Sequence, residues 1–215
     1  MQEWTGFLAA VRTGGWVIYP LSLLAVLALT IIIDRAYVFM RFGRAPANVL
    51  PSTRLGADGS TPTWAASLSR LAAYNAFNRM SEPWLPEPDV PLWLREASSQ
   101  SVAAQIERDM SRGLWLLETI VTAAPLLGLL GTIVGMMRSF QLFGGNGLVD
   151  PGGVTGGVAQ SLVATAIGLV VAVFALFAFN YFSRRLDRLM DELESFANAR
   201  LSEMRLARGI DGERP

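Results

Sequence analysis

The sequence predicts an all-α membrane protein with three transmembrane helices, of which the second and third are long and extend into the cytoplasm. Of its 215 residues, 52% are hydrophobic and only 17% are charged, whereas soluble domains carry about 25% charged residues. The uncharged stretches 13–33, 119–137 and 158–182 are each long enough to cross a hydrocarbon core of about 30 Å. A buried helix of a soluble protein rarely has this length without a polar face.

The composition excludes several classes of function. The chain has no cysteine and no histidine, and all 18 basic residues are arginine. Thiol nucleophiles, disulfides, histidine-based triads, nearly all zinc sites and Schiff-base lysines are therefore excluded. We expect neither an enzyme nor a bound cofactor or metal. The formal net charge of zero also argues against a nucleic-acid partner.

Residues 1–12 are expected to form an amphipathic helix at the outer membrane interface. Their large apolar side chains fall at helical spacing on one face. The following segment, 13–33, is predicted to be a retained transmembrane helix, because Asp34 and Arg35 follow it in place of a signal-peptide cleavage site. The interfacial side chains are Trp4, Phe7, Leu8 and Val11.

The distribution of arginines predicts the orientation of the chain. Nine arginines lie within 34–118 and seven follow Ser183, whereas Arg12 and Arg138 are the only ones on the other two flanks. Because arginine concentrates in cytoplasmic loops, the N-terminus is predicted to be periplasmic and the C-terminus cytoplasmic.

The remaining segments follow from helix breakers and apolar periodicity. A modest helix is expected over 65–80, before four prolines that lie between 81 and 91. No breaker is evident between Leu92 and the second span, so one continuous helix is predicted there. The charged end of the third helix is compatible with a solvated face or with a bundle below the membrane. The predicted segments are a cytoplasmic loop over 34–91, a long helix over 92–140, a periplasmic loop over 141–156, a long helix over 157–208 and a tail over 209–215.

Small residues form a stripe on each of the two later spans. In the second span the spacing allows close approach of another helix, Pro125 predicts a kink, and Thr132 flanks the stripe. In the third span the stripe also carries the hydroxyls of Ser161 and Thr165. The predicted packing residues are Ala124, Pro125, Gly128, Gly131, Gly135, Gly157, Gly168 and Ala172.

Two interpretations of these stripes remain open on spacing alone. The helices could pack through them, with the hydroxyls bonded to backbone carbonyls. Alternatively, several copies could associate and form a narrow, weakly polar pore wall. Residues 119–137 and 158–183 contain no ionisable Asp, Glu or Arg, and a proton relay in the bilayer needs an ionisable group. If the protein conducts protons, another chain must supply the carboxylate.

Two motifs resemble the ExbB/TolQ/MotA proton-channel family, and ExbB-like members in particular. They are APLLGLLGTIVGM at 124–136, followed by Phe140, and SLVATAIGL at 161–169, followed by Asn180. The first span is also similar to the first helix of that family at 14–16, 20–21 and 34–35. The resemblance covers all three spans in their order.

The resemblance implies a homopentamer in the bacterial inner membrane. Its second and third helices would surround the single transmembrane helices of an ExbD/TolR-like partner, whose aspartate would carry the proton. Ion flow would then drive work on a TonB/TolA-like protein. By position, Thr132 and Thr165 correspond to the pore threonines of the family, and Ser161 and Gln160 are expected on the same path.

The sequence departs from the family pattern at two positions. Relatives often carry a glutamate where this chain has Gln160, and a neutral amide does not exchange protons at neutral pH. Many relatives have a proline at the position of Phe174, so a straighter third helix is expected here. The competing hypothesis is a non-conducting membrane scaffold that oligomerises through its glycine-rich helix faces.

Overall fold

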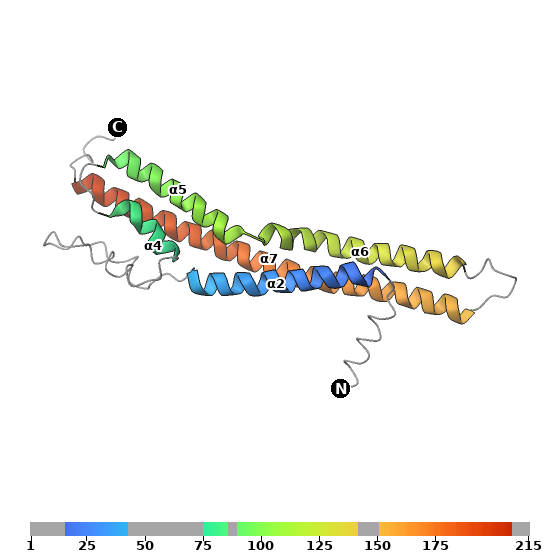
Figure 1. The fold of residues 1–215 in the computed structure, drawn as a ribbon. Helices are drawn as coiled ribbons and strands as arrows, with labels where there is room; N and C mark the ends of the chain where they lie inside the picture. The colour runs from blue at the N-terminus through green and yellow to red at the C-terminus, as the bar shows by residue number, and fades with distance from the viewer. Residues whose placement is uncertain (1–15, 43–74, 86–89, 142–150, 208–215) are drawn as a thin grey trace. The chain divides into compact units, whose positions relative to one another are not determined.

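The computed structural model describes residues 16–42, 75–85, 90–141 and 151–207 (Figure 1). Its helices are α2 (Ile18–Phe42), α4 (Ala76–Ser81), the 3-10 helix η1 (Glu82–Trp84), α5 (Leu92–Ser111), α6 (Leu114–Gln141) and α7 (Pro151–Ala207).

The helices confirm the predicted fold class. The stretches Ile18–Phe42, Leu92–Gln141 and Gly152–Leu206 are long and apolar enough to cross a membrane, and no strand occurs in the part of the chain that the structure describes. Many large apolar side chains on these stretches are exposed in the single chain, as expected for contact with lipid or with another subunit. Examples are Leu126, Phe140, Leu162 and Phe177.

The chain divides into two compact units. The first, called the apolar unit here, comprises Met1–Ile33 and Gly113–Phe182. The second, called the charged unit, comprises Asp34–Arg112 and Ser183–Pro215.

The continuous helix predicted over 92–140 is wrong, because the structure contains two helices that are separated at Arg112 and Gly113. Gly113 has a φ of +82°, a left-handed conformation that glycine adopts without the steric cost of a Cβ atom. Glycine at this position is a common way to end an α-helix. The sequence pattern missed the break because Gly113 fits the apolar stripe of a longer helix.

The ends of two other helices also differ from the sequence prediction. Helix α2 continues beyond Asp34 to Phe42, although residues from 34 onward were expected in a loop. Helix α7 begins at Pro151, inside the predicted loop over 141–156. Proline suits the first turn of a helix, since its missing N–H has no helical acceptor there.

Several predicted features lie outside the described residues. These are the interfacial helix over 1–12, residues 43–74 of the predicted loop over 34–91, which include most of the helix over 65–80, and the tail over 209–215. Where the description resumes, the side chain of Asn75 accepts a hydrogen bond of 2.9 Å from the backbone N–H of Phe77 and so caps α4.

The core of the charged unit combines large apolar side chains with buried arginines. One guanidinium nitrogen of Arg95 donates to the carbonyls of Pro83 and Leu85, at 2.9 and 2.6 Å. These bonds attach the end of η1 to α5. The largest buried apolar side chains of this unit are Phe77, Trp84, Ile106, Leu193 and Phe196.

Two further buried arginines are held by acceptors within the charged unit. Arg35 donates to the carbonyls of Asp109 and Met110 at the end of α5, both at 3.2 Å. Arg200 pairs with Glu203 at 2.8 Å. Burial lowers the pKa of Arg200, and the charge of Glu203 opposes that shift.

Candidate functional site

The small-residue stripes of α6 and α7 face each other within one chain. A Cβ atom on Gly168 would lie 2.6 Å from the carbonyl oxygen of Ala124, and one on Gly135 would lie 2.6 Å from the Cβ of Ser161. Carbon atoms make van der Waals contact at about 3.5–4.0 Å, so only glycine fits at these two positions without a shift of the neighbouring helix.

The other predicted packing residues lie along the same contact. Cβ atoms would come within 3.0 Å of the Thr165 Cα at Gly128 and within 2.7 Å of the Ala164 Cβ at Gly131. Gly157 faces the hydroxyl of Ser139. Ala124 and Ala172 are buried, and α6 continues as a helix through Pro125.

Both threonines donate their hydroxyl protons to backbone carbonyls. The Thr165 hydroxyl donates across the helix pair to the carbonyl of Gly128 at 2.9 Å. The Thr132 hydroxyl donates within α6 to the carbonyl of Leu129 at 2.7 Å. A carbonyl has no proton to give, so each hydroxyl must be the donor, and its remaining lone pairs can accept a further hydrogen bond.

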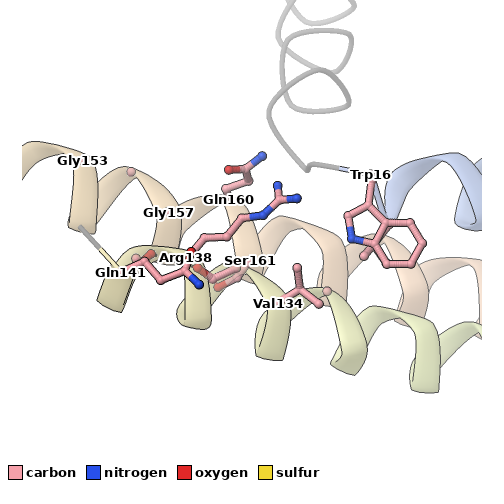
Figure 2. A pocket seen from close by; sticks show the side chains of 13 residues that line it. Trp16, Val134, Arg138, Gln141, Gly153, Gly157, Gln160 and Ser161 are labelled. Carbon is pink, nitrogen blue, oxygen red and sulfur yellow. Dashed lines mark hydrogen bonds between the residues drawn. The ribbon is translucent and has the colours of Figure 1, made fainter. Parts of the chain in front are cut away.

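A cavity of 620 Å³ lies between the C-terminal end of α6, the N-terminal turns of α7 and the residues that precede α2 (Figure 2). Polar side chains and the backbone of five glycines line much of it, and the indole of Trp16 covers part of its wall. Figure 2 shows the guanidinium of Arg138 extending from α6 toward the turn of α7 that carries Gln160. The polar side chains are Arg138, Ser139, Gln141, Gln160 and Ser161.

The four residues that were predicted to share one path lie on different sides of the helices. Gln160 and Ser161 line the cavity, whereas Thr132 and Thr165 do not. Gln160 and Thr165 are five residues apart, which places them about 140° apart around the axis of α7. Gln160 therefore lies on the side of the cavity that Trp16 and Val17 also line, and Thr165 lies at another edge of the helix pair.

Sequence reasoning did not identify Arg138 as a cavity residue, although it ends the uncharged stretch of the second span. Within the described part of the apolar unit, Glu118 and Arg138 are the only Asp, Glu or Arg residues. They are 20 residues apart on α6, a rise of about 30 Å that matches the thickness of a hydrocarbon core.

The described residues contain no group of three side chains that could hold a metal ion.

Comparison with known proteins identifies the family. Residues 65–195 match the model of the MotA/TolQ/ExbB proton channel family. The biopolymer transport protein ExbB-like 3 of Synechocystis sp. is 36% identical over 175 residues, which cover 79% of this chain and 81% of that protein. The Tol-Pal system protein TolQ of Pseudomonas aeruginosa is 29% identical over 142 residues, which cover 65% of this chain and 62% of that protein. The chain therefore belongs to the MotA/TolQ/ExbB proton channel family.

Proposed function

We propose that this multi-pass membrane protein is the proton-channel subunit of a complex that converts ion-motive force into mechanical work. Several copies, five by the family resemblance, form a ring in the bacterial inner membrane around an ExbD/TolR-like single-span partner. The partner's aspartate carries the proton, and a TonB/TolA-like protein receives the work. The N-terminus is periplasmic and the C-terminus is cytoplasmic, in agreement with the arginine distribution.

The distribution of charge carries this proposal. Between Glu118 and Arg138, α6 has no ionisable side chain, and α7 has no Asp, Glu or Arg from Pro151 to Phe182. A proton cannot cross about 30 Å of hydrocarbon by side-chain relay without an ionisable group. A family of proton channels built on such helices therefore requires an acid from a second chain.

The two threonines favour the protonated form of that acid. Their own protons are engaged with the carbonyls of Leu129 and Gly128, so toward a partner they offer only lone pairs. A hydrogen-bond acceptor stabilises a protonated carboxylic acid and not its anion. Thr132 and Thr165 thereby stabilise the protonated aspartic acid of the partner in the low-dielectric part of the path.

The cavity beside Gln160 supplies water at the periplasmic end. Its volume of 620 Å³ exceeds many times the volume of about 30 Å³ that one water occupies in the liquid. The amide of Gln160 is neutral, and the guanidinium of Arg138 has hydrogen-bond donors and no acceptor. At this end of the subunit, protons therefore move through water and not through a relay of side chains.

The scaffold alternative relied on glycine-rich faces that would bind a second copy. Those faces are already occupied, because the glycines of α6 contact α7 of the same chain. Any oligomer must use other surfaces, such as the exposed apolar side chains of the spans. No described feature favours the scaffold over the channel.

A flux measurement tests the proposal. The chain is co-expressed with a short single-span protein that carries a membrane aspartate, purified as a complex, weighed by native mass spectrometry and reconstituted into liposomes. We expect several copies of this chain per complex and proton uptake that depends on the partner. If proton uptake does not depend on the partner, the channel proposal fails and the scaffold hypothesis takes its place.

The same assay tests the threonine path. Thr132→Leu removes an acceptor from the path and should lower the flux at least about tenfold, in line with the loss of a group that handles the proton. Thr30→Leu is the matched control, because the hydroxyl of Thr30 likewise donates to a carbonyl of its own helix, that of Val26, at 2.8 Å. Equal flux in the two variants would refute the path through Thr132.

A further inference from the structure

Glu118 is the one acidic residue in the described part of the apolar unit. It is the fifth residue of α6, and its side chain is exposed. The other titratable side chains described there are Arg138 and the phenols of Tyr19 and Tyr181. A carboxylate is therefore present at one end of α6 only, the end opposite the Arg138 cavity.

Glu118 lies on the same line of α6 as Thr132. The positions Glu118, Pro125 and Thr132 are separated by seven residues each. Seven residues turn an α-helix by about 700°, which is only about 20° less than two full turns. The three side chains therefore follow one side of α6, with Glu118 about 21 Å from Thr132 along the axis.

Pro125 provides a polar group between them. Proline has no N–H, so the carbonyl of Val121 lacks its ordinary helical donor. That carbonyl lies one turn from Glu118 along the helix and can accept a hydrogen bond from water. The hydroxyl of Thr122 donates to the carbonyl of Thr119 at 2.9 Å, and its lone pairs add a further acceptor.

We infer that Glu118 is the proton-exchange residue at the cytoplasmic mouth of the path, an inference that rests on the proposed function. The partner's carboxylic acid releases its proton to water beside Thr132, and water passes a proton along the line to the carboxylate of Glu118. The neutral Glu118 then releases its proton to the cytoplasm and becomes a carboxylate again. Each step moves one proton and consumes no other reactant.

Few charges face Glu118 from neighbouring helices. Residues 18–33 of α2 and 151–182 of α7, which share its unit, contain no Asp, Glu or Arg. Outside the unit, the next charges along these chain segments are Asp34, Arg112 and Arg184. Glu118 is therefore the one carboxylate that the described part of the apolar unit can offer to a proton.

The test compares proton uptake by complexes with Glu118→Gln, Glu118→Asp and Glu118→Ala. The control is Asp191→Asn, which removes an exposed acid from the charged unit. We expect Glu118→Gln and Glu118→Ala to lower the flux at least about tenfold and Glu118→Asp to retain most of it. Formate should restore flux to Glu118→Ala, since a small acid can exchange the proton in its place. A purely structural role would not respond to formate.

The outcomes separate this inference from the function on which it rests. If the unmodified complex shows no partner-dependent uptake, both fail. If Thr132→Leu blocks uptake and Glu118→Gln conducts like the unmodified complex, only the inference about Glu118 fails. It fails equally if Glu118→Gln releases the partner or changes the number of subunits, because Glu118 is then an assembly residue.

Discussion

Different kinds of residue pack the interior of the apolar unit and the interior of the charged unit. In the apolar unit, backbone approaches backbone: the contact between Gly168 and Ala124 leaves no room for a methyl group. In the charged unit, large side chains such as Trp84 and Phe196 fill the core, and arginines such as Arg95 are buried among them.

The contrast follows from what surrounds each unit. In lipid, burying an apolar side chain between helices gains little, because the lipid is equally apolar, so van der Waals contact between close backbones dominates. In water, removing large apolar surface is the main driving force, and a buried charge is tolerated only where acceptors satisfy it. The two units should therefore fail in different ways when they are mutated.

The largest effect is expected for Arg95→Met in the charged unit. The change leaves the carbonyls of Pro83 and Leu85 without their charged donor. An unsatisfied buried acceptor costs about 1–3 kcal/mol, so we expect a loss of about 2–6 kcal/mol in the free energy of unfolding of this unit. Hydrogen exchange of the intact complex should show faster exchange over α4 and α5. Arg108→Met, at an exposed position of α5, should leave exchange unchanged. Equal effects of both variants would contradict the role of burial.

A medium effect is expected for Gly168→Ala in the apolar unit. The added methyl group meets the carbonyl of Ala124, and overpacking of this kind destabilises by about 1–3 kcal/mol. Gly156→Ala is the control, because nothing lies within 4 Å of its added Cβ and alanine favours a helix by up to about 1 kcal/mol. Thermal unfolding of the complex in detergent should therefore shift in opposite directions. A stabilising Gly168→Ala would show that the helices are not in close contact.

A smaller effect on stability is expected for Thr165→Val. The variant keeps the shape of the side chain and loses the hydrogen bond to Gly128, which contributes about 1 kcal/mol. Thr165→Ser retains the hydroxyl and should unfold at nearly the same temperature as the unmodified protein. Proton flux should fall in Thr165→Val by more than stability does, since the valine offers no lone pair to the path. Unchanged flux would assign Thr165 to packing alone.

The smallest effect is expected for Glu96→Gln. Its partner Arg205 lies 3.8 Å away, and the two side chains are 42% and 36% exposed. Exposed ion pairs contribute about 0–1 kcal/mol, and salt screens this contribution. The same change at Glu203 removes the carboxylate beside the buried Arg200 and should be clearly more destabilising in thermal unfolding at high salt. Similar losses of thermal stability for the Glu96 and Glu203 variants would contradict the distinction between surface charges and core charges.

Part of the candidate site could be predicted from spacing. The positions of Gly128, Gly131 and Gly135 on one face of a helix follow from 3.6 residues per turn, and their contact with α7 is what such a stripe favours. The separation of Gln160 from Thr165 also follows from helical geometry. Which of these two sides faces Trp16 and Val17 depends on contacts between distant segments, which local sequence does not encode.

The sequence alone determined the helical class and the three apolar stretches, because the length of an uncharged stretch is a local property that lipid selects directly. It also determined that no ionisable group lies in the middle of α6. Only the tertiary structure decided that α5 and α6 separate at Gly113, that the glycine faces close on each other within one chain, and that Arg138 and Gln160 line one cavity. Each of these depends on which segments meet, and the free energy of such contacts is a sum over residues far apart in the chain.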